Sequence, residues 1–343
     1  MMAKSVFLLV REDADRHPIL KSVKNYFSDC NIELKIHDLR VGLRGNKKNY
    51  DLAIVSDPLV YLLWLIFFRN SRKVLFFSLE MFEYQLPNKG IKNILRNLLF
   101  RFAHRISLKQ CFAIFPNDIR RSFYLEKKWT EPDRSEVLFN VPSQKMLALS
   151  REVKSKISKA EAKARLANFI NISPEKTIYI YAGSIDKGSR GGGIILEAFR
   201  NISDVALIVV GRDSDKIFSE GYSLGESNVF YLGEKTQEEI VSLLWACDYG
   251  VAYYSSSVLN TKYCAPVKLY EYSLMELPLV CNRNEGVISV WGKDCFYYEC
   301  ASDLSRLINK LGQAPAKRNN SSLEIISFEK QLAKLMRSVE ENS

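Results

Sequence analysis

The stretch TIYIYAGSIDKGSRGGGIILEAF, residues 177–199, begins as a strand and ends as a helix. Its first part, TIYIYAG, is rich in β-branched and aromatic residues and carries no charge, which is typical of a buried strand. A glycine-rich turn follows, and IILEAF then has the composition of a helix. Such a strand, turn and helix form the first half of a βαβ unit, whose second strand runs parallel to the first. The stretch therefore predicts a parallel sheet covered by helices.

The same alternation continues on both sides of this stretch. Apolar runs of strand length occur at 5–10, 32–39, 50–56, 73–79, 111–116 and 137–142, and again at 205–211, 228–233, 249–254 and 277–282. Segments long enough for helices separate these runs, as in a parallel sheet that is covered on both faces. The sequence therefore predicts an α/β protein with two Rossmann-like, doubly wound domains.

The domain boundaries follow from the segments that lack strands. Residues 143–175 are charged and helix-prone, and we expect them to form a linker between a first domain, 1–142, and a second, 176–322. The final segment, 323–343, reads as a helix that packs back on the first domain. A chain of 343 residues has the length expected for two such domains.

The excess positive charge lies in the first half of the chain. The formal net charge is +10; residues 1–150 contain 25 Lys and Arg against 15 Asp and Glu, whereas residues 151–343 contain 24 of each. This distribution indicates that the first domain faces a polyanion, such as anionic lipid head groups, nucleic acid or a phosphorylated acceptor. No nucleic-acid recognition motif accompanies the charge, so we expect an anionic membrane surface and no nucleic acid as partner.

The cysteines, histidines and apolar runs predict the compartment. Seven cysteines are scattered without a C-x-x-C pair, which argues for a reducing compartment and against disulfides and structural zinc. His17, His37 and His104 have no metal-binding spacing, so we expect no metal. The longest apolar run, PLVYLLWLIFF at 58–68, is about half a membrane span. We expect a cytoplasmic protein, peripheral at the inner face of the cell membrane.

A helix predicted at 88–109 has apolar residues at 91, 94, 95, 98, 99, 102 and 106, the period of an amphipathic helix. We expect this apolar stripe to face the sheet. The basic residues at its rim would then remain available to anionic lipid.

The glycine-rich turn at 183–193 is a candidate anion site. The start of a helix offers unpaired backbone N–H groups and a partial positive charge, and Lys187 and Arg190 would add cations beside it. The turn is neither a P-loop nor a dinucleotide fingerprint, because no G-K-[ST] follows and the spacing of Gly183 and Gly188 differs. The alternative is an ordinary surface turn.

The stretch APVKLYEYSLMELPLV, residues 265–280, contains a second candidate site. After Pro266 it reads as a short apolar helix in which Lys268 and Glu271 lie on one face. Lys268 can reach a phosphate, and a carboxylate one turn into the helix can accept hydrogen bonds from two vicinal hydroxyls, as on a ribose. Alternatively, the two residues form a solvated pair in which Glu271 complements the helix dipole.

These motifs occur together in a known family. The segments YAGSI, KGSRGG, LEAF, VALIVVGRD, NVFYLG, ACDYGVAYY and APVKLYEYSLMELPLVC appear in the order and spacing of glycosyltransferase family 4. The chain resembles the bacterial polysaccharide members, which carry a P-x-K-[LF]-[YF]-E-Y signature. KVLFFSLEMFE and FAIFPNDIRRSF with VLFNVP look like the matching N-terminal half. The resemblance implies the GT-B fold, in which two Rossmann-like domains face each other across a cleft.

The resemblance also implies an activity. It predicts a retaining, metal-independent transfer of a sugar from a UDP- or GDP-linked donor to a glycan or lipid-linked glycan acceptor, without a cofactor. Glu271 would hold the donor ribose, and Arg190, Lys187 and Lys268 its pyrophosphate. Other positions expected at the donor are Gly183, Gly188, Arg212, Pro266 and Leu269.

The sequence departs from the family at three places. Many members carry a first glutamate eight positions before the second, where this chain has Tyr263. The glycine pair of the first N-terminal loop is replaced by REDADRHP at 11–18. A histidine at the end of an N-domain strand has no match, and Glu80 lies in that neighbourhood as a candidate catalytic residue. Two alternatives therefore stay open: a nucleotide-sugar epimerase of the same fold, and a non-catalytic nucleotide-sugar-binding partner subunit.

Overall fold

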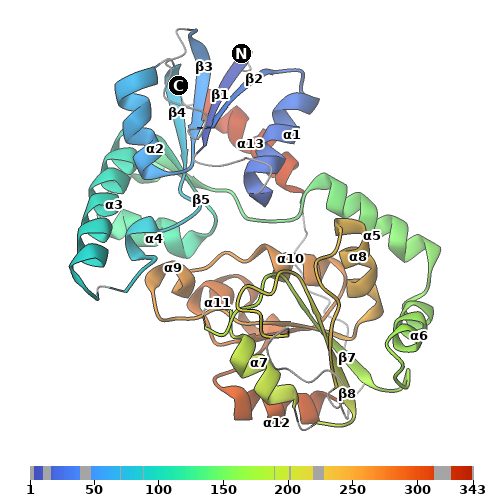
Figure 1. Ribbon diagram of the computed structural model, residues 1–343. Coiled ribbons are helices and arrows are strands. Elements are labelled where there is room, and N and C mark those ends of the chain that lie inside the picture. Colours follow the sequence, from blue (N-terminus) through green and yellow to red (C-terminus); the bar gives the residue numbers. More distant parts are fainter. Residues whose placement is uncertain are drawn as a thin grey trace. The chain divides into compact units, whose positions relative to one another are not determined.

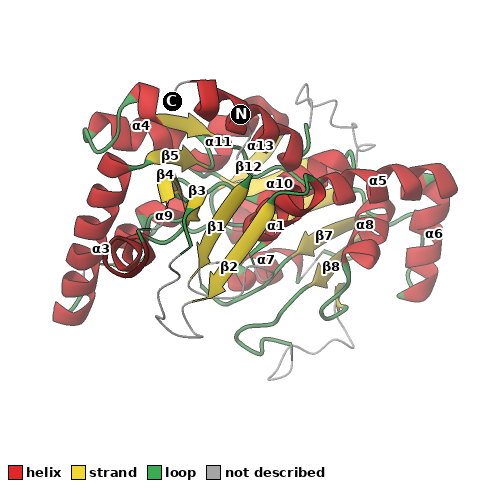
Figure 2. Ribbon diagram, turned by 90° about the horizontal axis from the view of Figure 1, so that it is seen from above, coloured by secondary structure: helices red, strands yellow, loops and turns green. Residues whose placement is uncertain are grey.

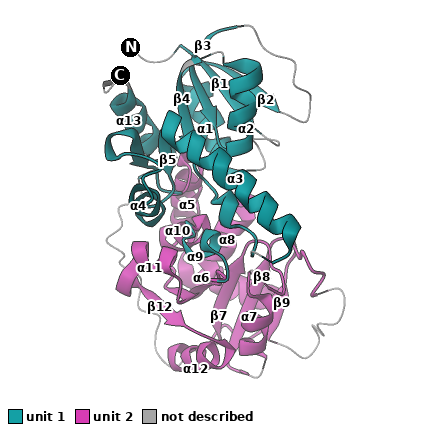
Figure 3. Cartoon of the chain, turned by 90° about the vertical axis from the view of Figure 1, so that its left-hand side faces the viewer, with its two compact units in different colours: residues 1–140, 257–265, 326–343 teal, residues 141–256, 266–325 magenta. Residues whose placement is uncertain are grey.

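The computed structural model in Figure 1 shows an α/β protein. The residues that it describes are 4–10, 17–38, 48–69, 71–87, 89–188, 190–200, 202–218, 228–312 and 326–341. The chain divides into two compact units, coloured in Figure 3. Unit 1 comprises residues 1–140, 257–265 and 326–343, and unit 2 comprises residues 141–256 and 266–325.

Unit 1 is built on a six-stranded parallel sheet with the order β2-β1-β3-β4-β5-β6. Its strands are β1 (Ser5–Val10), β2 (Glu33–Asp38), β3 (Tyr50–Val55), β4 (Ser71–Phe77), β5 (Phe112–Phe115) and β6 (Ser135–Val137). Figure 2 shows β1 and β2 running side by side in the same direction. The order reverses between β1 and β3, which places a topological switch point there.

Helices cover both faces of this sheet. They are α1 (Pro18–Asp29), α2 (Pro58–Leu63), α3 (Ile91–Gln110), α4 (Asp118–Glu126), α9 (Leu259–Lys262) and α13 (Phe328–Glu341). The π-helix η3 (Trp64–Phe68) and the 3-10 helices η4 (Phe82–Tyr84) and η5 (Pro132–Arg134) accompany them. Helices α1 and α13 lie on one side of the sheet, and α2 and α3 lie on the other (Figure 1). The core on the second side contains Phe7, Phe76 and Phe115 from the strands, packed with Trp64 and Tyr124 from the helical segments.

Unit 2 contains a second six-stranded parallel sheet, with the order β12-β11-β10-β7-β8-β9. Its strands are β7 (Thr177–Ala182), β8 (Val205–Val210), β9 (Val229–Tyr231), β10 (Tyr249–Ala252), β11 (Leu279–Asn282) and β12 (Cys295–Tyr298). The six residues of β8, VALIVV, are all buried, as expected for a central strand with helices on both faces.

The helices of unit 2 are α5 (Gln144–Lys156), α6 (Lys159–Phe169), α7 (Gly192–Phe199), α8 (Gln237–Ala246), α10 (Val267–Leu274), α11 (Glu285–Trp291) and α12 (Ala301–Gly312), with the turn η6 (Gly292–Asp294). Helices α7 and α12 cover one face of the sheet, where Phe199 and Ile308 pack on Tyr179 and Leu207. Helices α8 and α10 lie on the other side (Figure 1).

The prediction of two α/β units with parallel sheets is confirmed. Two details differ from the sequence prediction. Residues 143–175, expected to form a linker, instead form α5 and α6 within unit 2, because Leu166, Met146 and Trp245 give these helices a buried face. The edge strand β12 was not predicted, since its apolar run CFYY is flanked directly by the charged residues Asp294 and Glu299. Residues 326–343 belong to unit 1, where α13 contacts α1.

Two glycines allow the chain segments that follow β7 and β8 to approach closely. Gly183 follows β7 and Gly211 follows β8, with φ angles of 130° and 124°, which side chains disfavour. A Cβ atom on Gly211 would lie 2.3 Å from the carbonyl oxygen of Gly183. The start of the glycine-rich loop therefore depends on the absence of a side chain at 211.

We predict that Gly211→Ala lowers the free energy of unfolding by about 3 kcal/mol or more, since it combines backbone strain with a clash against backbone. Gly233→Ala is the matched control: Gly233 also has a positive φ, 73°, but a Cβ there would meet no atom within 4 Å. Strain alone should cost about 1–2 kcal/mol at that position. Denaturant unfolding measures both variants, and equal losses would contradict the close approach.

Candidate functional site

The topology of unit 2 places the candidate site at the carboxyl ends of β7 and β10. These two strands are neighbours in the sheet, and the strand order reverses between them. In open α/β sheets, ligands bind beyond the carboxyl ends of the strands at such a switch point. The glycine-rich loop follows β7, and the chain from Tyr253 onward follows β10.

The two helices that carry the predicted site residues begin without a side-chain cap. Gly191 precedes α7 and Pro266 precedes α10, and neither supplies a side chain that accepts a hydrogen bond. In contrast, α5, α6, α8 and α11 of the same unit are capped by Ser143, Ser158, Thr236 and Asn284. In the first turn of α7 the Gly192 N–H donates to the Asp186 carbonyl at 2.8 Å, and no N-cap side chain binds the other first-turn N–H groups of α7 and α10. Such groups are suited to bind an anion.

Two aspartates shape the glycine-rich loop. The Asp186 carboxylate accepts hydrogen bonds from the backbone N–H groups of Gly188 (3.0 Å) and Arg190 (2.8 Å). The Asp215 carboxylate accepts one from the N–H of Lys187, at 2.7 Å. The side chains of Lys187 and Arg190 are exposed. The loop thus has a defined backbone bonding pattern and presents two cations to solvent.

Lys268 lies against this loop. Its Nζ is 4.1 Å from the centroid of the Tyr181 ring, a cation–π contact. A Cβ on Gly183 would lie 3.1 Å from the same Nζ, so the absence of a side chain at 183 leaves room for the ammonium group. The Tyr181 hydroxyl donates to the carbonyl oxygen of Ser184 at 3.0 Å. The structure therefore brings together Lys268, Gly183 and the start of the loop.

Glu271 is partly buried one turn after Lys268. Burial raises the pKa of the Glu271 carboxyl above its ordinary value, and the positive charge of Lys268 opposes part of this shift. Leu269, between them, is fully buried, so its side chain belongs to the core and only its backbone is available to a ligand. Pro266 is buried at the start of the helix, and Arg212 is exposed in the turn after β8.

Tyr272 fixes α10 to both switch-point strands. Its hydroxyl accepts a hydrogen bond from the Ala182 N–H (2.8 Å) and donates to the Val251 carbonyl (3.3 Å). Its ring lies directly over Gly250, where a Cβ would be 2.3 Å from a ring carbon. Neither Tyr272 nor Gly250 was predicted as a site residue, although Tyr272 stands in the motif KLYEY next to Glu271.

Two tyrosines that follow β10 also border the site. A Cβ on Gly191 would lie 2.2 Å from the Tyr253 side chain, so Tyr253 packs against the start of α7. The Tyr254 ring centroid is 5.7 Å from the Lys268 Nζ, and Asn282 bonds to the Tyr254 backbone at both N–H and carbonyl. Both tyrosines are only partly buried.

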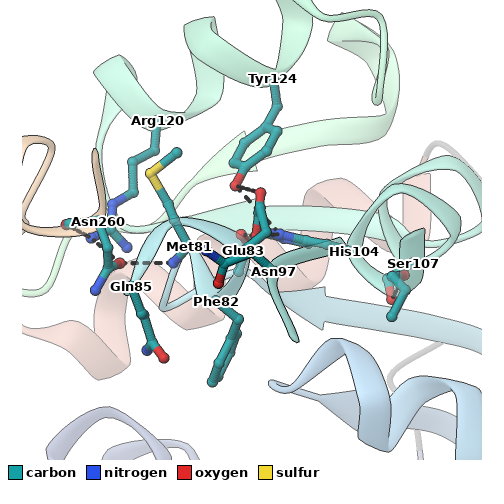
Figure 4. Close-up of polar contacts among 12 residues, drawn as sticks. Met81, Phe82, Glu83, Gln85, Asn97, His104, Ser107, Arg120, Tyr124 and Asn260 are labelled. Atoms are coloured by element: carbon teal, nitrogen blue, oxygen red, sulfur yellow. Dashed lines mark hydrogen bonds and ion pairs between the residues drawn. The ribbon is translucent and has the colours of Figure 1, made fainter. Parts of the chain in front are cut away.

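In unit 1, a second glutamate, Glu83, lies three residues after the candidate Glu80 and is buried. Glu80 is partly exposed in the turn after β4, whereas Glu83 is 1% exposed in η4. Its carboxylate contacts His104 Nδ1 at 2.8 Å and accepts a hydrogen bond from the Tyr124 hydroxyl at 2.6 Å (Figure 4). On the other side of the ring, His104 Nε2 is 3.0 Å from Ser78 Oγ. The residues that bond to one another in this network are 20 or more positions apart in the sequence, so no local motif predicts the network.

The network lowers the pKa of the Glu83 carboxyl. Burial acts to raise the pKa of Glu83, but His104 and the hydrogen bonds from His104 and Tyr124 outweigh it and hold the pKa below its ordinary value. All three side chains are almost completely buried. The network therefore joins η4, α3 and α4 inside unit 1, and its geometry supports a structural role.

Arg120 holds the segment that leads into α10. This arginine is 3% exposed, and its guanidinium donates to the carbonyl oxygens of Tyr263 (2.7 Å), Asn260 (2.8 Å) and Leu79. Figure 4 shows Arg120 beside Asn260, whose side-chain oxygen also accepts from the Met81 N–H. Tyr263, which replaces the first glutamate of the family motif, thus belongs to unit 1, where its ring packs on Phe123 at 5.7 Å.

Comparisons with known proteins identify the class of fold. The sequence matches no protein-family model and no curated protein. The structure, however, has the GT-B fold of nucleotide-sugar glycosyltransferases, as its similarity to several solved enzymes shows.

Three of the similar structures are a sucrose-phosphate synthase, HepE in complex with UDP and glucose, and the glycosyltransferase WaaG. Sucrose-phosphate synthase from Thermosynechococcus elongatus aligns over 99% of this chain and 100% of its own, with a TM-score of 0.72 and 13% identity. HepE of Anabaena, solved with UDP and glucose, aligns over 98% and 100%, with a TM-score of 0.68 and 13% identity. WaaG, a glycosyltransferase involved in lipopolysaccharide biosynthesis, aligns over 96% and 99%, with a TM-score of 0.67 and 12% identity.

An enzyme of another class shares the fold. The UDP-GlcNAc 2-epimerase of Methanocaldococcus jannaschii aligns over 97% of this chain and 99% of its own, with a TM-score of 0.52 and 13% identity. At these identities the likeness concerns the fold alone.

The buried network makes a testable prediction about stability and pH. Because folding lowers the pKa of Glu83, its carboxylate stabilises the fold above the ordinary value of 4.5, and this contribution is lost as the pH falls through the lowered pKa. Glu83→Gln should therefore cost about 3 kcal/mol at pH 7, as for other broken buried pairs, and the difference from the native protein should shrink in acid.

Denaturant unfolding between pH 7 and pH 3.5 measures this difference. Glu80→Gln is the control, since Glu80 lies nearby but outside the network, and it should change stability little. A Glu83→Gln protein as stable as Glu80→Gln at pH 7 would rule out the network as a source of stability.

Proposed function

We propose that the protein is a retaining glycosyltransferase of family 4 that transfers a sugar from a UDP- or GDP-linked donor to a glycan or lipid-linked glycan acceptor. The single observation that carries the proposal is the arrangement at the switch point of unit 2. There, two helices begin without a side-chain cap, Lys268 lies against Gly183, and Glu271 follows one turn later. Solved structures of the same fold include HepE bound to UDP and glucose, which supports a nucleotide-sugar donor.

Each group in this arrangement suits one part of such a donor. The diphosphate would bind the first-turn N–H groups of α10 and those of α7 after Gly192, whose own N–H donates to Asp186, with Lys268, Arg190 and Lys187 as cations. The Glu271 carboxylate would accept hydrogen bonds from the two vicinal hydroxyls of the ribose. Gly183 and Gly188 would let the loop approach the phosphates without side chains in between.

The cations also suit the chemistry of the leaving group. When the bond between the sugar and the diphosphate breaks, negative charge develops on the departing diphosphate. Lys268 is held by the Tyr181 ring at 4.1 Å, so its charge is in place before the reaction and needs no reorganisation. We propose that these side chains stabilise the leaving group without a divalent metal.

A non-catalytic nucleotide-sugar-binding subunit and an epimerase are the competing functions. The position of the first family glutamate is occupied by Tyr263, which favours the first alternative, and an epimerase shares the fold. All three functions require donor binding at Lys268 and Glu271. They differ afterwards, because only a transferase releases nucleotide in proportion to the acceptor glycosylated, and only an epimerase inverts a carbon of the sugar.

The donor proposal predicts the effect of Glu271→Gln. The ribose hydroxyls would lose their charged acceptor, so kcat/KM should fall by an amount equivalent to roughly 2–4 kcal/mol of transition-state stabilisation. The measurement is nucleotide release from a panel of UDP- and GDP-sugars, after a thermal-shift screen has found the donor. Glu197→Gln, an exposed position on α7, is the control. Native turnover in the Glu271→Gln protein would remove Glu271 from the site.

The raised pKa of Glu271 predicts a pH dependence of donor binding. Only the carboxylate accepts hydrogen bonds from both hydroxyls, so affinity should fall with decreasing pH, and the fall should begin above the ordinary glutamate value of 4.5. Calorimetric titration with the nucleotide-sugar from pH 8 to pH 4 measures this change. The Glu271→Gln protein should bind weakly at all these pH values, and a native affinity that stays constant down to pH 4, below the ordinary glutamate value, would contradict the assignment.

The leaving-group proposal predicts activity without divalent metal. Nucleotide release should persist in EDTA, and Lys268→Met should reduce it at least tenfold, since it removes a cation next to the departing diphosphate. Loss of activity in EDTA and its recovery with magnesium or manganese would show that a metal, rather than these side chains, carries the charge.

A further inference from the structure

Helix α3 of unit 1 exposes its apolar side. Six large apolar side chains along three turns of this helix are between 42% and 77% exposed: Ile91, Ile94, Leu95, Leu98, Leu99 and Phe102. Their spacing of three, four and seven residues places them along one side of the helix. Soluble proteins rarely expose contiguous apolar surface of this kind without a binding role.

The opposite side of α3 is buried and partly polar. Asn97 donates to the Leu86 carbonyl at 3.0 Å, His104 joins the network with Glu83, and Ser107 bonds within the helix at 2.9 Å. Phe100 and Ala103 complete this packed side. The sequence-based expectation that the apolar stripe faces the sheet is therefore wrong, because partnered polar side chains occupy the core side.

The sequence segment that contains α3 carries basic residues and no acidic ones. Between Tyr84 and Asn117 the sequence contains six basic residues and no acidic one. Lys92, Arg105 and Lys109 are exposed on α3. Arg96 and Arg101 are partly buried and pack over the rings of Phe100 and Tyr84, at 4.7 and 5.6 Å. Helix α3 thus combines an apolar strip with cations and carries no acidic residue.

The exposed apolar side chains and the basic residues of α3 together favour one kind of partner over another. In a symmetrical dimer, the same surface of each copy would meet, and the cations of one copy would face those of the other. A bilayer with anionic lipids instead supplies negative phosphates for the cations and an acyl boundary for the apolar strip. Within the described part of the chain, no helix is both long and apolar enough to cross a membrane.

We propose that α3 lies in the plane of an anionic membrane surface, with Ile91, Leu95, Leu98 and Phe102 inserted at the acyl boundary and Lys92, Arg105 and Lys109 at the lipid phosphates. A helix of 20 residues extends for about 30 Å along such a surface. This inference adds a partner to the proposed function, since it would bring the enzyme to a lipid-linked acceptor. It does not depend on the donor site, because the contact needs no nucleotide.

Vesicle co-sedimentation tests the proposal. The full chain should bind vesicles of phosphatidylcholine with 30% phosphatidylglycerol in low salt, bind pure phosphatidylcholine weakly, and dissociate as salt is raised. Leu95→Gln with Phe102→Gln should weaken binding about tenfold or more, because these side chains would no longer enter the apolar layer. Both side chains are more than half exposed, at 61% and 62%, so the substitutions should leave the fold intact.

The control for the apolar variant is Phe169→Gln. Phe169 is 76% exposed on α6 of unit 2, and its replacement should leave vesicle binding unchanged. For the charges, Lys92→Gln with Arg105→Gln should weaken binding about 30-fold, whereas Lys293→Gln with Lys310→Gln, exposed in unit 2, should not.

Three results would overturn the proposal. The first is a lack of binding to anionic vesicles in low salt, and the second is binding that the α3 variants do not weaken relative to their controls. The third is the observation of a dimer by sedimentation velocity, together with its dissociation in the Leu95→Gln, Phe102→Gln variant, because α3 would then be covered by a second copy. Nucleotide-sugar binding is measured separately without vesicles, so a failure of the donor site and a failure of the membrane surface are distinguishable.

Discussion

The hydroxyl of Tyr272 makes the contact on which the candidate site depends. It bonds to the backbone of β7 through Ala182 and to the backbone of β10 through Val251, the two strands between which the sheet order reverses. The ring needs Gly250 beneath it. Because α10 is fixed in this way, Lys268 lies over Tyr181 and against Gly183. One side chain thus determines where the cation and, one turn later, the carboxylate are held.

Much of the fold could be predicted from the sequence, because buried parallel strands read as apolar runs between helices. The strands at 5–10, 50–55 and 205–210 follow this rule closely. The rule fails where charged residues lie within or directly beside an element. Strand β12 is flanked by Asp294 and Glu299, and α5 and α6 were interpreted as a charged linker because their buried faces are narrow.

The site divides in the same way. Lys268, Glu271 and the glycine-rich loop could be proposed from the sequence, because their residue types stand at motif spacing in continuous stretches. Tyr272 was overlooked since its role depends on two strands that are distant in sequence. The network of Glu83, His104 and Tyr124 and the orientation of α3 could not be predicted, because hydrophobic periodicity assumes that the buried side of a helix is apolar, and in α3 Asn97, His104 and Ser107 lie on that side.

The central claim is that the starts of α7 and α10 bind the diphosphate of a nucleotide-sugar. Hydrogen–deuterium exchange with and without saturating nucleotide tests it most directly, since a bound phosphate slows the exchange of the amide N–H groups from which it accepts hydrogen bonds. The account predicts slower exchange in peptides that cover residues 183–193 and 266–272, with little change in α12. Nucleotide that binds but leaves both peptides unchanged would contradict the account.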